Sequence, residues 1–347
     1  MSRIFPCTEW AERDPATMGF SAERLAAVGS WLDQEAGDAP YRVAIARGGA
    51  LVAEFSKGIE RDEKVRLRSA SKSAYTLLLG IAVEEGRLAG LDAKVTDHYP
   101  ELVDVGPEEG PKPGRYAYPE NAGIRFRHLA GNTSGYLKPD EPPGEQFHYQ
   151  TFGMNVISNA MAKIYGLYDP ADPDRLPGCA ALVAEKLRKP IGGSWEHIYY
   201  DFDYEPGTAA KRGVYGHGLQ LVADARDCCR LGHLWLSNGN WNGRQVVPAW
   251  YLEEATRTNA EILANERPEN FKYGLGFWTN DHGRLWPDLP RDIYGAWGGG
   301  AKYIWVSPAR DLVMVMCPGP WDELMEEAPR RPKERAFIKS VLDALER

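Results

Sequence analysis

The stretch Arg68-Ser69-Ala70-Ser71-Lys72-Ser73-Ala74-Tyr75 contains the only Ser-x-x-Lys of this 347-residue chain. The apolar residues that follow, without a proline, predict a helix, and on a helix positions i and i+3 share a face. The Lys72 amine can therefore lie beside the Ser69 hydroxyl and take its proton, which makes the serine a usable nucleophile. The backbone N–H of Ser69 at a helix start can also stabilise an oxyanion. About one such motif is expected by chance in a chain of this length, so other features must support it.

The composition is that of an ordinary soluble globular protein, with 43% apolar and 26% charged residues. The length suits one large domain or two closely joined ones. The net charge is −8 and no basic run is present, which argues against a nucleic acid or an anionic membrane as partner. The sequence has no P-loop, no dinucleotide fingerprint and no Gly-x-Ser-x-Gly elbow.

The cysteines and the N-terminal segment indicate where the protein works. The five cysteines form no pairing framework, and Cys228 and Cys229 are adjacent, so reduced thiols are expected. The segment Met1 to Trp10 carries no apolar signal core, and no apolar run is long enough to span a bilayer. We therefore expect a cytoplasmic protein.

Strand patterns gather at the two ends of the chain. The runs Arg42 to Arg47 and Ala50 to Phe55 are separated by Gly48-Gly49, a strong hairpin signal. Further strands are expected near the C-terminus, at 273–278, 301–306 and 312–316.

Helical patterns fill the middle of the chain and flank both ends. Terminal helices are expected after Ser21, a plausible N-cap, and over Pro332 to Arg347. Between them, helical spacing covers 154–165, 180–187 and 223–236.

The order of these patterns predicts an α+β fold. One antiparallel sheet built from both chain ends is covered by the terminal helices, with a mostly helical insertion between. We place the sheet subdomain at residues 1–67 and 270–347 and the helical subdomain at 68–269. The active site is expected between the two.

Three features then need one explanation: Ser69-x-x-Lys72, Tyr149 after a Pro-Pro-Gly loop, and Trp297 to Gly300 before a strand. Together and in this order they resemble the serine β-lactamase and penicillin-binding protein superfamily. The resemblance is closest to its class C-like branch, which includes family VIII esterases and 6-aminohexanoate-dimer hydrolases. It covers nearly the whole chain. Segments that match in family order are Glu85-Gly86-Arg87-Leu88, Asn132-Thr133-Ser134-Gly135, Pro143-Gly144 before Tyr149, and Gly218-Leu219 before Ala223 to Asp227.

The resemblance implies roles for particular residues. Ser69 would attack a carbonyl and become acylated, while Lys72 and Tyr149 would move the protons. The backbone N–H groups of Ser69 and Gly300 would form the oxyanion hole. Neither a cofactor nor a metal is implied. The residues expected to contact the substrate are Thr151, Tyr215, His217, Trp297, Gly298 and Gly299.

The chain departs from the family pattern at two positions. The usual Tyr-x-Asn is here Tyr149-Gln150-Thr151, so a hydroxyl replaces the amide. The Lys-Thr-Gly element is Trp297-Gly298-Gly299, which lacks the cation that meets a β-lactam carboxylate and looks like the esterase branch. Both changes count against efficient β-lactamase or D,D-peptidase activity.

The resulting hypothesis is a serine hydrolase of small esters or amides that works through a Ser69 acyl-enzyme, with carboxylesterase activity the first choice. The alternatives are a linear amide hydrolase, a weak β-lactamase, or a non-catalytic binding protein on the same fold. The expected partner is the small-molecule substrate. The sequence does not indicate the oligomeric state.

Several residues keep a second interpretation. Tyr149 and Trp297 could be packing aromatics, and Tyr215 and His217 could belong to a structural turn. Cys228, Cys229 and His233 fit no zinc spacing and are better explained as buried residues of a helix.

Overall fold

In the computed structural model, which describes residues 3–6, 9–205, 207–321 and 327–346, the strands around Gly48-Gly49 form the predicted hairpin. Strand β1 (Tyr41–Arg47) pairs antiparallel with β2 (Ala50–Lys57). Both turn glycines have a positive φ, +61° and +81°, a region that residues with a side chain rarely adopt. The glycine pair thus permits the tight reversal that joins the two strands.

The hairpin pairs with strands from the other end of the chain, as predicted. The C-terminal strands are β8 (Trp278–Thr279), β9 (Tyr294–Gly298), β10 (Lys302–Ser307) and β11 (Leu312–Met316). Among the described residues, six strands form one antiparallel sheet in the order β2-β1-β11-β10-β9-β8. Because β1 pairs with β11, hydrogen bonds between the first and last strands join the two ends of the chain.

Helices account for much of the remaining chain. The α-helices are α1 (Ala22–Ala36), α2 (Lys72–Tyr75), α3 (Leu77–Glu84), α4 (Phe126–Ala130), α5 (Thr151–Ile164), α6 (Gly178–Val183), α7 (Arg212–Tyr215), α8 (Ala225–Leu236), α9 (Ala249–Ala255), α10 (Ala260–Asn265) and α11 (Glu327–Asp343). A π-helical turn, Ala184–Arg188, extends α6.

The structure also contains short 3-10 turns. They are η1 (Pro15–Met18), η2 (Arg68–Ser71), η3 (Val95–Asp97), η4 (Pro100–Val103), η5 (Pro119–Gly123), η7 (Pro268–Asn270) and η8 (Pro308–Arg310). Of these, η2 matters most for function, because it carries Ser69 and runs directly into α2.

No helix among the described residues combines the length and the apolar character needed to cross a lipid bilayer.

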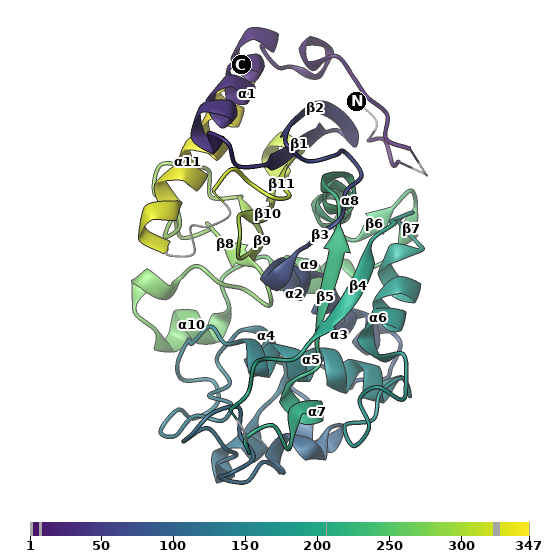
Figure 1. Ribbon diagram of the computed structural model, residues 1–347, viewed down its shortest axis with the longest axis vertical. Helices are drawn as coiled ribbons and strands as arrows, with labels where there is room; N and C mark the ends of the chain where they lie inside the picture. Colours follow the sequence, from purple (N-terminus) through teal and green to yellow (C-terminus); the bar gives the residue numbers. More distant parts are fainter. Residues whose placement is uncertain (1–2, 7–8, 206, 322–326, 347) are drawn as a thin grey trace.

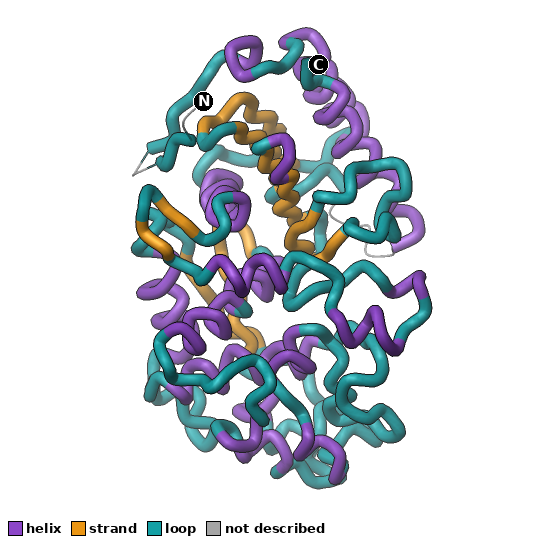
Figure 2. Tube along the Cα trace, turned by 180° about the vertical axis from the view of Figure 1, so that it is seen from behind, coloured by secondary structure: helices purple, strands orange, loops and turns teal. Residues whose placement is uncertain are grey.

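Side chains of the large sheet alternate between two apolar layers, as period-two strands require. Val43 and Met314 pack in the layer with α1 and α11, whereas Ala44 and Val313 pack in the layer with α8. Gly232 brings α8 close to the sheet, since an added Cβ there would lie 2.5 Å from a methyl carbon of Val313. Figure 1 shows α1 and α11 side by side at the sheet, and Figure 2 shows helices and loops dominating the opposite half of the molecule.

The structure contains a second sheet that the sequence analysis did not predict. Strands β3 (Val65–Arg66), β5 (Gly218–Ala223) and β4 (Glu196–Tyr200) pair antiparallel in the order β3-β5-β4. Strand β3 is too short to show a period, and β5 starts at a glycine that was interpreted as part of a turn. A two-stranded ribbon, β6 (Asn240–Trp241) and β7 (Arg244–Gln245), follows α8.

Two predicted elements have different boundaries in the structure. Residues 273–278 were expected to form one strand, but only Trp278 belongs to a strand, because the chain folds back on itself at Gly276. Gly276 has φ +88° and the Gly274 N–H donates to the Phe277 carbonyl, which closes a turn. The C-terminal helix α11 begins at Glu327, five residues before the expected Pro332, and ends at Asp343.

Two elements pack with the part of the molecule on the other side of the predicted boundaries at 67/68 and 269/270. Helix α8 belongs to the middle segment but packs on the large sheet, and β3 precedes residue 68 but pairs with β5. Sequence order alone does not show that a segment returns to the sheet in this way.

Candidate active site

Ser69 and Lys72 lie on the same face of the segment formed by η2 and α2. In a 3-10 turn, residues three apart are eclipsed, so the spacing itself brings the two side chains together. Lys72 Nζ is 2.7 Å from Ser69 Oγ. The lysine is 4% exposed and the serine is half-buried, so the hydroxyl lies on the solvent side of a buried amine.

The Lys72 amine has two further hydroxyl partners, both near the start of α5. Its Nζ is 2.9 Å from Tyr149 Oη and 3.2 Å from Thr151 Oγ1. An ammonium group has three N–H donors, and here three hydroxyl oxygens surround it. Among the described residues, no carboxylate lies within ion-pair distance of Lys72. The structure therefore brings Ser69, Lys72, Tyr149 and Thr151 together, with groups that can both donate and accept protons.

Tyr149 is held in place by aromatic neighbours that the sequence analysis did not assign to the site. Its ring stacks on Trp278 with centroids 5.6 Å apart and meets the edge of Tyr273 at 5.9 Å. The side chain is still 38% exposed, so one side of the ring faces solvent. The aromatic run at 273–278 was a signal for these residues, but its interpretation as a strand hid their role.

Asn132 fixes the backbone on both sides of Tyr149. Its carbonyl accepts from the His148 N–H and its Oδ1 accepts from the Gln150 N–H, both at 2.9 Å. Asn132 has φ +56°, a conformation that asparagine tolerates better than most residues. The resemblance included this turn, but no spacing in the sequence indicates its contact with 148–150.

Strand β9 lies directly against the segment that carries Ser69. A Cβ at Gly298 would lie 2.1 Å from the Leu67 carbonyl oxygen and 3.1 Å from the Ala70 nitrogen, so only glycine fits there. After β9 the chain turns through Gly300 (φ +80°) and Ala301 (φ +51°) into β10. The predicted oxyanion donor thus follows a strand end that contacts the neighbours of Ser69, and its role stays a prediction.

Trp297 packs against helix α11 instead of lining the pocket that contains Ser69. The Arg330 guanidinium carbon is 3.3 Å from the centroid of the indole, and Trp278 meets it at 4.8 Å. Of the two interpretations left open for Trp297, packing is the one the structure favours. Gly298 and Gly299 do not line this pocket either.

Tyr215 and His217 were expected to contact the substrate, and the structure places neither at the Ser69 pocket. Tyr215 is buried, and its hydroxyl reaches the carbonyl oxygens of Glu109 and Thr208. His217 is also buried and stacks on Tyr199 with centroids 4.0 Å apart. Burial lowers the pKa of its imidazole, despite nearby aspartates. His217 lies just before β5 and has φ +50°, outside the extended region of a strand, and its side chain lines a different pocket.

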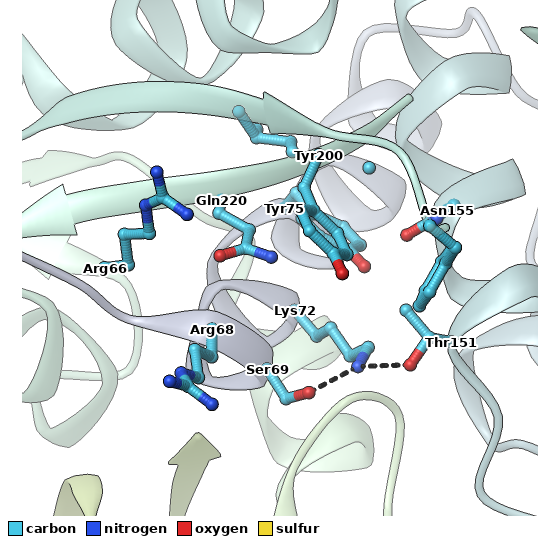
Figure 3. A pocket seen from close by; sticks show the side chains of 12 residues that line it. Arg66, Arg68, Ser69, Lys72, Tyr75, Thr151, Asn155, Tyr200 and Gln220 are labelled. Atoms are coloured by element: carbon cyan, nitrogen blue, oxygen red, sulfur yellow. Dashed lines mark hydrogen bonds between the residues drawn. The ribbon is translucent and has the colours of Figure 1, made fainter. Parts of the chain in front are cut away.

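The pocket at Ser69 has a volume of about 330 Å³ and is shown in Figure 3. It lies where the small sheet meets η2 and α5. Its lining residues are Arg66, Arg68, Ser69, Lys72, Tyr75, Thr151, Asn155, Tyr200, Phe202, Gly218, Leu219 and Gln220. Only Ser69, Lys72 and Thr151 were predicted, and five of the other nine come from β3, β4 and β5, a sheet that was not predicted.

The charge of the pocket is positive, although the protein as a whole is acidic. Its lining contains Arg66, Arg68 and Lys72 but no aspartate or glutamate. Burial raises the pKa of the Tyr75 phenol well above its usual range, so this lining residue carries no negative charge at neutral pH. The pocket therefore suits a neutral or negatively charged small molecule.

The described part of the chain contains no group of three or more His, Cys, Asp or Glu side chains arranged to hold a metal ion. Cys228 and Cys229 are buried in α8, as the sequence analysis expected. His233 contacts the Ile4 carbonyl oxygen through Nε2 at 2.8 Å, and burial lowers the pKa of its imidazole to about 4.

Comparison with known proteins places this site in a family. The chain is 22% identical over 351 residues to the 6-aminohexanoate-dimer hydrolase of Paenarthrobacter ureafaciens. The alignment covers 91% of this chain and 82% of the relative. Its fold is similar to a penicillin-binding protein homologue from Caulobacter crescentus, with TM-score 0.62, 16% identity, and 94% and 99% of the two chains covered. It is also similar to EstCE1, described as a hydrolase with promiscuous acyltransferase activity, with TM-score 0.62, 14% identity, and 91% and 98% covered.

These structural neighbours share the predicted fold, an antiparallel sheet flanked by helices with a largely helical insertion. The family model described as Beta-lactamase matches residues 33–319, which include every element that contributes to the Ser69 pocket. The chain therefore belongs to the beta-lactamase family of serine hydrolases.

Proposed function

We propose that this enzyme hydrolyses small esters, or alternatively small linear amides, through an acyl-enzyme formed on Ser69. The observation that carries the proposal is the position of Lys72 Nζ, 2.7 Å from Ser69 Oγ and 2.9 Å from Tyr149 Oη. Both distances are within the reach of direct proton transfer. Nucleophile, amine and phenol thus form one continuous hydrogen-bonded chain.

The reaction proceeds in two halves. Ser69 Oγ attacks the substrate carbonyl carbon and its proton passes to the Lys72–Tyr149 pair. The pair then protonates the leaving alcohol or amine, which departs and leaves an ester on Ser69. In the second half the pair takes a proton from water and the resulting hydroxide attacks the ester. The acid departs as the pair returns that proton to Ser69 Oγ. The N–H groups of Ser69 and Gly300 would hold the oxyanion in both halves.

Two features favour esters over β-lactams. Thr151 accepts a hydrogen bond from Lys72 at 3.2 Å but has no amide with which to hold a substrate carbonyl. Trp297 stands where the family has a lysine, and it packs against Arg330. The linear amide alternative is supported by the 6-aminohexanoate-dimer hydrolase relative, at 22% identity.

The test uses a fluorophosphonate probe and p-nitrophenyl butyrate with the wild type, Ser69→Ala and Ser30→Ala. Ser30 is an exposed serine of α1 and serves as the matched control. We expect Ser69→Ala to lose probe labelling and to lower kcat on the order of 10⁴-fold or more, with Ser30→Ala unchanged. A wild type that neither labels nor exceeds the Ser69→Ala rate would leave a binding protein as the surviving alternative.

Parallel assays separate the substrate classes. Nitrocefin reports β-lactam hydrolysis, and the linear dimer of 6-aminohexanoate reports amide hydrolysis. We expect ester turnover to exceed both, and rapid nitrocefin turnover would overturn the argument from Trp297.

A further inference from the structure

Arg66 and Arg68 stand out among the residues that line the Ser69 pocket. Both are exposed and, among the residues that the structure describes, neither contacts a carboxylate. Arg68 directly precedes the nucleophile, so their Cα atoms are about 3.8 Å apart. Arg66 lies in β3, two residues earlier. Two arginines thus line the pocket in which the carbonyl of the substrate would be attacked.

Several arginines elsewhere in this acidic protein bind carboxylates. Arg61 and Arg226 both contact Glu12 and Glu54, and Arg127 contacts Asp92 and Glu254. The net charge is −8, so acidic side chains outnumber basic ones in this chain. Among the described residues, no carboxylate contacts Arg66 or Arg68 in this way, so both side chains are available to a ligand.

The nearest acidic residue in the small sheet is already engaged. Arg66 and Glu196 both pair in register with Val222 of β5, one from each side. Glu196 Oε1, however, accepts an ion-pair contact from Lys64 Nζ at 2.9 Å. The sheet thus contains a carboxylate that could approach Arg66, and a lysine binds it instead.

Polar neighbours extend the cationic side of the pocket. Figure 3 shows Arg66, Gln220 and Arg68 on one side of Ser69, with Thr151 and Asn155 on the other. Arg68 has φ +50°, a conformation uncommon for a residue with a long side chain. The pocket volume of about 330 Å³ suits a short chain, not a polymer.

We propose that Arg66 and Arg68 bind a carboxylate of the substrate, so that the natural substrates are small esters or amides that carry a free carboxylate. Guanidinium groups match a carboxylate geometrically and can bind it in bidentate fashion. This inference rests on the proposed hydrolytic function and specifies the substrate class of the same site. The carboxylate belongs either to the acyl part, as in a half-ester of a dicarboxylic acid, or to the leaving group, as in an acylated hydroxy or amino acid.

The experiment compares esters that differ only in this charge. Mono-p-nitrophenyl adipate and its methyl ester test the acyl part, and the hexanoyl esters of 4-hydroxy-3-nitrobenzoate and of its methyl ester test the leaving group. For the wild type we expect kcat/KM to favour the acid of one pair about tenfold, since an exposed site in water yields modest discrimination. The preference should decline with added salt, which screens exposed charges.

The variants are Arg66→Gln, Arg68→Gln and Arg68→Lys, with Arg24→Gln on α1 as the matched control. Each glutamine variant should reduce the acid preference several-fold, and Arg68→Lys, which keeps the charge but not the planar fork, should retain part of it. Arg24→Gln should keep the full preference. Because the readout is a ratio within one variant, a general loss of active enzyme does not affect it.

A binding measurement keeps the test independent of catalysis. Calorimetry gives the Kd of monomethyl adipate for Ser69→Ala alone and combined with Arg66→Gln or Arg68→Gln. If changing either arginine raises the Kd of Ser69→Ala for monomethyl adipate, the inference holds even for a protein without hydrolytic activity. If the wild type hydrolyses acid and methyl ester equally well, or if neither arginine affects the Kd, the inference is wrong although the hydrolase proposal stands.

Discussion

Two strands hold the segment that carries Ser69, and they differ in both charge and chemistry. Strand β9 contacts it through Gly298 and contributes small and aromatic residues, among them Trp297. Strand β5 contacts it through Leu221, and its sheet contributes Arg66 and Gln220 to the pocket. In the family pattern the substrate-binding cation belongs to the strand that corresponds to β9. Here the pocket's arginines lie on β3 and beside Ser69, so the positive charge is on the side of the small sheet and not on β9.

The largest expected effect concerns the contact between β9 and the nucleophile segment. Gly298→Ala places a Cβ 2.1 Å from the Leu67 carbonyl oxygen, so the strand or the turn has to move. We expect about 3 kcal/mol of destabilisation in chemical denaturation. The same movement displaces the neighbours of Ser69, which should lower kcat/KM for p-nitrophenyl butyrate about 100-fold.

The matched control for this variant is Gly90→Ala. An added Cβ at Gly90 meets no atom within 4 Å, and the residue has no positive φ. A Gly298→Ala enzyme as stable and active as Gly90→Ala would mean that β9 does not set the position of Ser69.

A smaller effect is expected from restoring the family's cation on β9. Trp297→Lys removes the indole that lies 3.3 Å from Arg330 and introduces a charge beside Arg330 and Arg331. We expect about 2 kcal/mol of destabilisation from the lost cation–π and ring contacts. Nitrocefin hydrolysis should not rise, because this position does not line the Ser69 pocket.

The control for the lysine variant is Trp297→Phe, which keeps an aromatic face toward Arg330. It should lose less stability than Trp297→Lys in the same thermal melt. A rise in nitrocefin turnover for Trp297→Lys alone would show that residue 297 reaches the substrate, and the contrast between the two strands would then disappear.

The smallest expected effect concerns the two hydrogen bonds that attach the segment of Ser69 to β5 and to the loop before β8. Ser71 Oγ accepts from the Leu221 N–H of β5 at 2.9 Å, and Ser73 Oγ donates to the Gly276 carbonyl, in the loop before β8, at 2.5 Å. Both serines are buried. Ser71→Ala leaves a buried N–H without a partner, which costs about 1–3 kcal/mol, whereas a carbonyl oxygen left unpaired is tolerated better.

Urea denaturation of Ser71→Ala and Ser73→Ala checks this order, with each variant serving as the control for the other. Ser71→Ala should be the less stable. Equal losses, or the reverse order, would show that the small sheet is not held to Ser69 more firmly than the loop.

The large sheet was predicted from the sequence, whereas the small sheet was not. The difference shows which features a single sequence reveals. Ser69, Lys72 and Tyr149 were predicted together because their residue types and order follow a motif, and the structure places Lys72 within hydrogen-bond distance of the other two. Their catalytic roles stay a prediction. The helix, hairpin and terminal strands follow from periodicity and glycine pairs. Strand β3 has two residues, and β4 exposes most of its side chains, so neither presents a clear period. Neither Arg66 nor Arg68 was consequently predicted to belong to the site.

Tyr215 and His217 differ from their expected placement for another reason. The segment 215–218 was considered either near the substrate or a structural turn, and the structure directs the His217 imidazole to a different pocket just before β5 begins. Trp278 and Tyr273 were missed for the opposite reason, since they are far from Tyr149 in sequence and reach it only because Gly276 turns the chain. Contacts of this kind depend on tertiary packing, which a single sequence does not specify.

Ser71 and Ser73 lie two residues apart on one short segment, yet they bind different parts of the fold. On the side of the small sheet the Leu67 N–H also donates to the Leu221 carbonyl oxygen, which adds a backbone bond to that attachment. Side chains of β3 and β4 that take part in neither attachment can change without breaking the bonds of Ser71 and Ser73. That separation gives a physical reason why one scaffold accommodates hydrolases of many different substrates.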